Sequence, residues 1–507
     1  MTHKFALVAF AGFLCLSVCP KAGAFGFAEV EQKAEALAKT PFQPLDKTVP
    51  PEAASMSYSV YQRIRFNKEK SIWRERSFPF RLEMFYRAFL FPERIRIHLI
   101  DRKGEASEVP FTTDLFTLDS PEMASLPATS ADYGFAGLKV YHDFKAPRGW
   151  QEAIIFQGAS YFRIPTKAFG LSNRGLAINT ASGKADEEFP AFTDFWVAEP
   201  TGKALTVYAL LDGPTVTGAY EFLVHPGPST SVDVKASLFF RQTPDRVGYA
   251  PLTSMFWYGE NNYRKFPDYR PEVHDSDGLL IQEANGNRIW RPLQTVKNHL
   301  VDAFVSPKAP RGFGLLQRDR AYANAVDNEA FYHHRPSAWI EPVGEGWNDG
   351  SVVLWQIPTV DEYHDNIVTY WMPDHTPQAG EKRSIQYRVT SMDGEPPGLP
   401  KDGQVVASYL MPSYGKMDRF LIMIDFAWGE KPPALFKEGK LPELQLEARG
   451  AEVLSQYVKP NVDGKSWRAH AVIQFPSETM NNLLRARLVT PEGWKSEEWV
   501  YTFVPQG

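Results

Sequence analysis

Two short acidic segments hold the carboxylates that could do chemistry. The first, residues 270–279, reads RPEVHDSDGL and contains Asp275 and Asp277; the second, residues 361–366, reads DEYHDN and contains Glu362 and Asp365. A proline and a glycine bracket the first segment, which indicates a loop. The second segment lies between apolar runs at 352–357 and 367–371, so we expect a loop between two strands. Either segment could equally be a solvated turn, and weak calcium binding is a further alternative for the first, although its spacing matches no EF-hand loop.

Two carboxylates that work together without a metal or a nucleophile point to glycoside hydrolysis. One carboxylate protonates the leaving oxygen and the other activates water. Direct inversion requires the two carboxyl groups to lie ~6.5–9.5 Å apart. The chain also holds 35 Phe, 21 Tyr and 13 Trp, whose rings can stack on sugars, although most aromatic residues of a large β-protein belong to its core. The strings Tyr161–Arg163 and Gln317–Arg320 could line a polar groove or form structural ion pairs.

Other common chemical motifs are absent from the sequence. There is no HExxH, no Walker A motif and no CxxC, and Gln317 occupies the third glycine position of a dinucleotide loop that would begin at Gly312. We therefore predict neither a metal nor a cofactor. The net charge of −5 argues against nucleic-acid binding, which requires a basic surface.

The elements that must position these residues are mainly strands. Apolar residues alternate with polar ones at 80–84, 94–99 and 232–240, which places one face in a core and the other in water. Prolines and glycines recur between such runs as turns would require. Only residues 27–39 show helical spacing. The sequence therefore predicts an all-β fold of antiparallel sandwiches.

The segment from Gly394 to Gly403, GEPPGLPKDG, is the best candidate for a linker, since neither a helix nor a strand tolerates that composition. We predict a large β-sandwich at 25–394, a linker at 395–403 and a second domain at 404–507. The second domain has the size and alternating runs of an immunoglobulin-like sandwich, notably at 420–424, 467–475 and 499–503.

The N-terminus has the pattern of a secretory signal peptide. A basic start precedes an apolar run from Phe5 to Cys19, and Ala22-Gly23-Ala24 offers a cleavage site after residue 24. The apolar run is shorter than the ~20 residues of a membrane span. Both cysteines, Cys15 and Cys19, would leave with the signal, and a chain without thiols suits an oxidising compartment. We expect export to the periplasm.

From about residue 55 to 375 the chain resembles the periplasmic glucan biosynthesis family OpgG/MdoG and OpgD. The strings that carry the resemblance occur in the family's order: GFAGLKVY (134–141), GASYFR (158–163), GLSNRGLAINTA (170–181), EEFPAF (187–192), YALLDGPTVTGAY (208–220), APLTSMF (250–256), RPEVHDSDGL (270–279), WRPL (290–293), GFGLLQRDR (312–320), RPSAWIEP (335–342) and DNIVTYW (365–371). The last hundred residues match more loosely, chiefly at 496–503.

This resemblance implies a galactose-mutarotase-like β-sandwich joined to an immunoglobulin-like domain, and a role in making osmoregulated periplasmic glucans with a β-1,2-linked backbone. It further implies an inverting endo-glucanase in which Asp365 is the general acid and Asp275 the general base, acting through a relay of waters. We expect a raised pKa for Asp365, from burial or from Glu362. Residues expected to contact the β-1,2-linked glucan are Glu362, Tyr161, Arg163, Arg270, Trp290, Arg318, Arg320 and Trp371.

Two alternatives remain open. Some relatives transglycosylate, and the protein could also be a non-catalytic glucan-binding factor that serves a membrane glucan synthase. The sequence departs from the family where a glutamate is usual, at Gln356, and at Asn173, Asn179, Asp186 and Gly213. These changes put the specific activity in doubt more than the chemistry.

Overall fold

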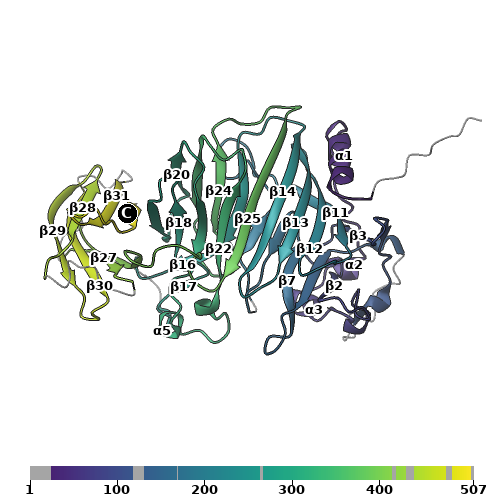
Figure 1. The fold of residues 1–507 in the computed structure, drawn as a ribbon, viewed down its shortest axis with the longest axis horizontal. Helices are drawn as coiled ribbons and strands as arrows, with labels where there is room; N and C mark the ends of the chain where they lie inside the picture. The colour runs from purple at the N-terminus through teal and green to yellow at the C-terminus, as the bar shows by residue number, and fades with distance from the viewer. Residues whose placement is uncertain are drawn as a thin grey trace, which may run out of the picture.

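The computed structural model describes residues 24–117, 131–167, 169–262, 267–413, 418–429, 439–475 and 482–503. The predicted signal peptide at 1–24 lies, except for Ala24, outside these residues. Strands dominate the described part of the chain, and none of its helices is long and apolar enough to cross a membrane. The prediction of an almost entirely β fold is therefore confirmed (Figure 1).

The first large sheet carries most of the strands around the acidic segments. Its ten strands include β10 (Ala177–Ile178), which pairs with β15, and otherwise follow the spatial order β2 (Phe80–Phe85), β6 (Gly137–Asp143), β7 (Trp150–Gln157), β8 (Tyr161–Arg163), β9 (Ser172–Arg174), β15 (Val247–Ser254), β24 (Ile367–Pro373), β23 (Gly350–Gln356) and β20 (Leu300–Ser306). The alternation at 80–84 accordingly becomes β2, which has Phe80 and Leu82 fully buried.

The second large sheet runs the length of the molecule. Its 14 strands follow the order β28 (Glu443–Ala448), β31 (Asn482–Val489), β32 (Glu498–Phe503), β19 (Arg288–Pro292), β18 (Gly278–Gln282), β21 (Gly312–Leu316), β22 (Ser337–Val343), β25 (Lys382–Met392), β14 (Thr230–Phe240), β13 (Val216–His225), β12 (Leu205–Asp212), β11 (Ala191–Ala198), β3 (Arg96–Ile100) and β4 (Ala106–Glu108). The alternations at 232–240 and 94–99 correspond to β14 and to the shorter β3.

The two large sheets pack face to face through their apolar sides. Leu82 and Ile154 of the first sheet belong to the same buried cluster as Val207 and Val234 of the second. The ring centroids of Phe156 and Phe222 are 5.0 Å apart across the interface. Such packing is the normal outcome for two amphipathic sheets, since each must cover its apolar face.

The C-terminal region adds a smaller sandwich. A four-stranded sheet, β26 (Val405–Pro412), β27 (Arg419–Ala427), β30 (Ser466–Gln474) and β29 (Glu452–Pro460), shares a core with β28, β31 and β32. Because β32 pairs in parallel with β19, with Trp499 opposite Trp290, this region is hydrogen-bonded into the second large sheet. The predicted strands at 420–424, 467–475 and 499–503 are β27, β30 and β32, and residues 393–404, which include the predicted linker at 395–403, connect β25 to β26.

Short elements complete the fold. The helix expected at 27–39 is α1 (Phe27–Ala38), whose Val30 and Ala34 are buried against β12 and β13 of the second large sheet (Figure 1). The remaining described elements are α2 (Pro51–Ala54), α3 (Tyr58–Tyr61), α5 (Tyr322–Ala325), the 3₁₀ helices η1 (Lys68–Lys70), η2 (Thr113–Leu115), η3 (Ala131–Tyr133) and η4 (Tyr332–His334), and the strand pairs β1 (Arg65–Phe66) with β5 (Phe116–Thr117) and β16 (Phe256–Tyr258) with β17 (Val273–His274).

The glycines that resembled the start of a dinucleotide loop have a packing role. Gly312 and Gly314 lie within β21, where a Cβ atom on Gly312 would collide with the ring of Trp339 and one on Gly314 with the carbonyl of Ala338. The close approach of β22 therefore requires both glycines.

Candidate active site

Asp275 lies in the short connection between β17 and β18. Its backbone N–H donates to the carbonyl of Met255 (2.8 Å), which holds the connection against the end of β15. Its carboxylate forms an ion pair with Nε of Arg335 (3.1 Å), and its side chain is only 16% exposed. Burial raises the pKa of Asp275 to about 6; the charge of Arg335 opposes this shift and that of Asp365 adds to it.

Asp365 lies in the loop between β23 and β24, as the sequence predicted, and its side chain is exposed. Its charge is close enough to Asp275 to raise the pKa of that carboxyl. The structure thus brings the two acidic segments together. It differs from expectation in leaving Asp365 in contact with solvent, while Glu362, the expected neighbour, binds Arg270 and Tyr332.

Asn366 fixes the loop of Asp365 against the strand beside Asp275. Its amide nitrogen donates to the carbonyls of Phe256 (2.9 Å) and Ile357 (2.9 Å), and its Oδ1 accepts from the N–H of Phe256 (2.8 Å). Phe256 in turn pairs with His274 in the sheet of β16 and β17. No local pattern in the sequence distinguishes Asn366, since an asparagine next to an acidic loop resembles any other turn residue.

Glu362 belongs to an ion-pair cluster beside the carboxylates. It accepts a hydrogen bond from the hydroxyl of Tyr332 (3.0 Å) and pairs with Arg270 (2.6 Å), which also contacts Asp268 (2.9 Å) and Asp327 (3.0 Å). Three carboxylates around one guanidinium hold each other in fixed positions, because the N–H groups of the planar guanidinium donate in fixed directions.

These ion-paired side chains line a hollow in the surface. Arg270, Tyr332, Glu362 and Arg335 line it, and Arg335 is the ion-pair partner of Asp275. The highly exposed rings of Tyr269 and Tyr363 stand at its rim. Polar walls with aromatic side chains at the edge suit a ligand with many hydroxyl groups and apolar ring faces.

A second hollow lies beside β8. Arg163 lines it together with Tyr61, Tyr141 and Gln157, and the charge of Arg163 also acts on Asp275. Tyr161, on the same strand, packs against the guanidinium of Arg174 (5.0 Å from its ring centroid). Burial raises the pKa of Tyr161, with a contribution from the charge of Asp365. Tyr161 and Arg163 are thus placed near both carboxylates.

Four of the expected glucan contacts lie elsewhere. Trp371 is fully buried between the large sheets, because it shares the inward face of β24 with Ile367. Trp290 is 3% exposed and stacks under the guanidinium of Arg318 (3.7 Å). Arg318 binds Glu395 (2.8 Å) and Glu497 (2.9 Å), and so joins β21 to the C-terminal region. Arg320 donates to Ser337 (3.4 Å).

The substitution that the sequence marked as a departure, Gln356, is also outside the hollows. Its side chain is fully buried at the end of β23, and its Oε1 accepts from the backbone N–H of Gln294 (3.0 Å). A neutral amide in this place satisfies a backbone donor, so its effect on the two carboxylates is indirect.

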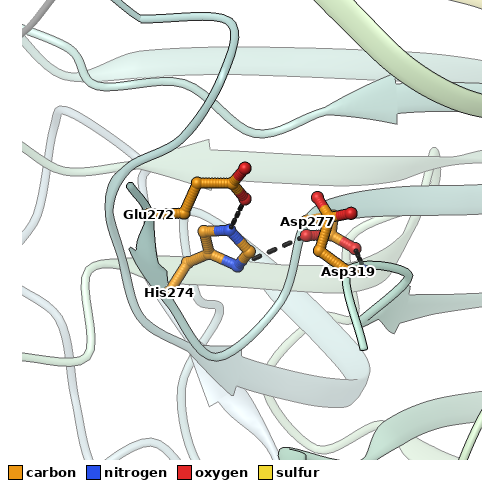
Figure 2. A group of neighbouring side chains, drawn as sticks. All are labelled: Glu272, His274, Asp277 and Asp319. Carbon is orange, nitrogen blue, oxygen red and sulfur yellow. Dashed lines mark hydrogen bonds and ion pairs between the residues drawn. The ribbon is translucent and has the colours of Figure 1, made fainter. Parts of the chain in front are cut away.

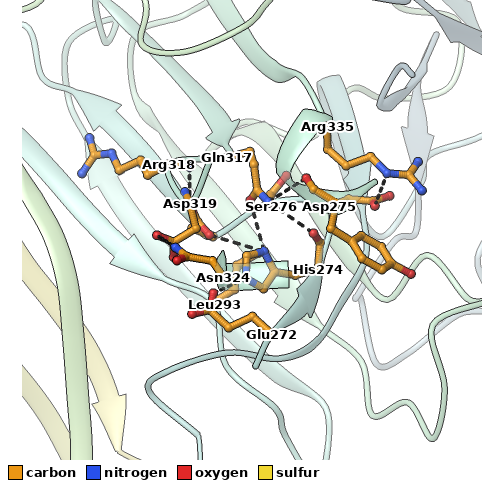
Figure 3. A network of polar contacts seen from close by, with 12 residues as sticks. Glu272, His274, Asp275, Ser276, Leu293, Gln317, Arg318, Asp319, Asn324 and Arg335 are labelled. Atoms are coloured by element: carbon orange, nitrogen blue, oxygen red, sulfur yellow. Dashed lines mark hydrogen bonds and ion pairs between the residues drawn. The ribbon is translucent and has the colours of Figure 1, made fainter. Parts of the chain in front are cut away.

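A polar network continues from Asp275 into the protein (Figure 3). His274 contacts Glu272 through Nε2 (2.9 Å) and Gln317 through Nδ1 (3.1 Å), and Gln317 donates to the carbonyl of Tyr332 (3.0 Å). Although burial acts to lower it, the charges of Asp277 and Glu272 raise the pKa of His274 to about 9. A protonated imidazole with both nitrogens engaged fixes the strand that precedes Asp275.

The fold and the site define a β-sandwich protein with two neighbouring carboxylates, Asp275 and Asp365, beside hollows lined by polar and aromatic side chains. Residues 25–503 match the family model described as "Periplasmic glucan biosynthesis protein, MdoG", and the chain belongs to this family. The family description implies a periplasmic location.

Relatives extend the match to nearly the whole chain. The chain is 38% identical over 492 residues to a Vibrio cholerae protein named "Glucans biosynthesis protein G", which covers 95% of this chain and 87% of that protein. It is 40% identical over 491 residues to a protein of the same name from Shewanella baltica, which covers 95% and 88% respectively. The resemblance noted from the sequence strings is confirmed.

Proposed function

We propose that this protein cleaves a β-1,2-linked glucan internally, with inversion at the anomeric carbon, during the synthesis of periplasmic glucans. Asp365 is the general acid and Asp275 the general base. The observation that carries the proposal is the electrostatic coupling of the buried Asp275 to the exposed Asp365, beside hollows that Arg163 and Arg335 line. Inverting hydrolysis requires such a pair of carboxyl groups in different environments.

The surroundings of Asp275 suit a base. With a pKa of about 6 it is ionised at neutral pH yet retains more affinity for a proton than an exposed aspartate. Arg335 stabilises the ionised form and orients it through the 3.1 Å ion pair. The base then takes a proton from the attacking water, directly or through a chain of waters.

The acid must act in a different environment. The side chain of Asp365 is exposed in the free protein, so the glucan itself has to cover it and disfavour its ionised form when bound. Asn366 holds the loop in place, so that binding brings the glycosidic oxygen to Asp365 rather than the reverse. Glu362, Arg270, Tyr161 and Arg163 contact the sugar hydroxyls along the hollows.

The exposure of Asp365 also favours a second candidate, a glucan-binding factor that presents chains to a membrane glucan synthase. A solvated carboxylate is an ordinary ligand for sugar hydroxyls and needs no proton. The C-terminal region, rigidly joined by Arg318 and β32, would then contact the partner. Transglycosylation uses the same residues as hydrolysis but joins the fragment to a sugar hydroxyl.

One comparison separates these functions. The full chain and Asp365→Asn are incubated with linear β-1,2-glucan, and new reducing ends and cyclic products are measured. We expect hydrolysis by the wild type and a loss of about 100-fold or more in Asp365→Asn, since general acid catalysis contributes about 10²–10⁴-fold. The matched control is Asp361→Asn, which alters an acid of the same loop and should keep near wild-type activity. Binding without new ends in the wild type would favour the presentation role, and cyclic products without new ends would favour transglycosylation.

A further inference from the structure

A second group of carboxylates lies behind the candidate active site. One ligand atom from each of Glu272, His274, Asp277 and Asp319 lies within 4.8 Å of the others (Figure 2). Glu272 and His274 come from the start of β17 and from the strand itself, Asp277 precedes β18, and Asp319 follows β21. Three chain segments therefore converge on one point in the protein interior.

Glu260 joins this group and brings in the C-terminal region. Its charge acts on Asp319, and its Oε1 accepts a hydrogen bond from the backbone N–H of Ser408 in β26 (3.1 Å). Four carboxyl groups thus share a buried space with one imidazole, and such an excess of negative charge is costly unless cations or protons offset it.

The imidazole is not itself available as a ligand. Nε2 of His274 faces Glu272 (2.9 Å), and Nδ1 faces Gln317 (3.1 Å) and Asp277 (3.3 Å). Because each ring nitrogen already has a protein partner, His274 orients Glu272 and Asp277 from behind, as residues around a metal site commonly do. The carboxylate oxygens of the cluster that His274 does not engage are suited to a cation that prefers oxygen ligands.

Asn261 provides an independent indication. Its side chain is 5% exposed, and its amide nitrogen donates to the carbonyl of Leu293 (2.6 Å), which fixes the orientation of the amide. The other end, Oδ1, has no hydrogen-bond donor among the residues that the structure describes. Asn261 lines the same small cavity as Glu260, Asp277 and Asp319. Its unsatisfied oxygen therefore adds a neutral oxygen ligand to the carboxylates there.

We propose that Glu260, Asn261, Glu272, Asp277 and Asp319 bind a calcium ion at the junction of the large sandwich and the C-terminal region. All five side chains offer hard oxygen ligands, which calcium prefers. Calcium–oxygen distances of about 2.3–2.6 Å place opposite ligands about 5 Å apart, and one oxygen from each of Glu272, Asp277 and Asp319 lies within 4.8 Å of the other two. Magnesium, with distances of about 2.0–2.1 Å, would require the cluster to contract.

The bound ion would stabilise both the segment that carries Asp275 and the junction between the large sandwich and the C-terminal region. Asp277 is two residues from Asp275, its backbone carbonyl accepts from Leu293 (2.7 Å), and its carboxylate accepts from the N–H groups of Arg318 and Asp319. Glu260 reaches β26 through Ser408. This proposal does not depend on whether the protein hydrolyses a glucan.

Calcium titration of the full chain tests the proposal. The protein is stripped with a chelator and titrated with calcium chloride by isothermal calorimetry, and its thermal midpoint is followed in parallel, with magnesium chloride as a comparison. We expect one calcium per chain, a saturable rise in midpoint and weaker binding of magnesium. Asp319→Asn and Glu260→Gln each keep the side-chain shape and should weaken calcium binding by about tenfold or more. Glu345→Gln, an exposed acid far from the cluster, should bind as the wild type does.

Several outcomes would overturn the proposal. One is the absence of saturable binding up to about 10 mM calcium, well above the ~10⁻³ M dissociation constants of weak extracellular sites. Another is equal affinity in the wild type and in both cluster variants, and a third is tighter binding of magnesium than of calcium. If Asp319→Asn fails to fold, calcium binding by the wild type and by Glu260→Gln still tests the proposal. A gain in stability of Asp319→Asn without any response to calcium would show that shared protons offset the charge.

Discussion

The side chain of Asn366 binds both the N–H and the carbonyl of Phe256, at 2.8 and 2.9 Å. These residues are 110 positions apart in the chain, and they tie the loop that carries Asp365 to the strand pair that leads to Asp275. The amide of Asn366 therefore helps to position the two carboxylates relative to each other. An amide that mimics a strand partner fixes a loop more firmly than a contact between two flexible side chains could.

Replacement of Asn366 by alanine should affect both stability and activity. Buried donors and acceptors of Phe256 and Ile357 would lose their partner, which costs about 2 kcal/mol or more. We expect this loss in the free energy of unfolding measured with urea, together with a lower rate of glucan cleavage at unchanged glucan binding. Asn298→Ala, at an exposed position, is the control and should change neither. A wild-type rate in Asn366→Ala would show that the loop is positioned by other contacts.

Asp275 should make stability depend on pH in a defined direction. Its pKa of about 6 in the folded protein exceeds the ~3.9 of an exposed aspartate. The folded state thus binds more protons than the unfolded state between these values, and the contribution of Asp275 to stability falls as the pH rises from about 4 to about 6. Asp275→Asn removes this contribution. The difference in unfolding free energy between variant and wild type should therefore shift in favour of the variant over this range.

The measurement is urea unfolding of both proteins at several pH values between 4 and 8. Subtraction removes the contributions of other titrating groups, provided that both proteins unfold in one transition. A difference that stays constant with pH would mean that the folded protein does not perturb Asp275.

Arg318 should be a residue of the junction rather than of the glucan site. It is buried against Trp290 and binds Glu395 and the fully buried Glu497. Arg318→Met keeps the apolar stem but leaves a buried carboxylate without this partner, and we expect a loss of about 3 kcal/mol. The surface pair of Arg449 and Glu447 offers a matched control, since Arg449→Met should have no measurable effect. Weaker glucan binding by a well-folded Arg318→Met protein would contradict this assignment.

Tyr363 should bind sugar without stabilising the fold. Its ring is 84% exposed at the rim of the hollow that Glu362 lines. Loss of one aromatic platform should weaken β-1,2-glucan binding about tenfold in Tyr363→Ala, by calorimetry, with an unchanged melting temperature. Tyr457→Ala, which removes an exposed ring of the C-terminal sheet, should leave glucan binding unchanged. Equal affinities in the two variants would place the glucan elsewhere.

The sequence predicted what depends on local patterns. Alternation located β2 and β14, helical spacing located α1, and flanking patterns placed the two acidic segments in loops. The choice of Asp275 and Asp365 within those segments came from the family resemblance. The sequence could not separate a tryptophan in a core from one in a groove, because Trp371 owes its burial to a second sheet that packs over β24. Arg318 likewise became a junction residue through Glu497, 179 positions away. The pairing of β32 with β19 and the bridge of Asn366 to Phe256 are long-range contacts that no local pattern encodes.

The most direct test of the central claim follows the anomeric proton of the first product. Linear β-1,2-glucan is added to the wild-type protein, and proton NMR records the new reducing ends before mutarotation. The proposed roles of Asp365 and Asp275 predict that new ends appear first as the α anomer, and that neither Asp365→Asn nor Asp275→Asn produces them at a comparable rate. First appearance of the β anomer, or binding of the glucan with no new ends at all, would contradict the account.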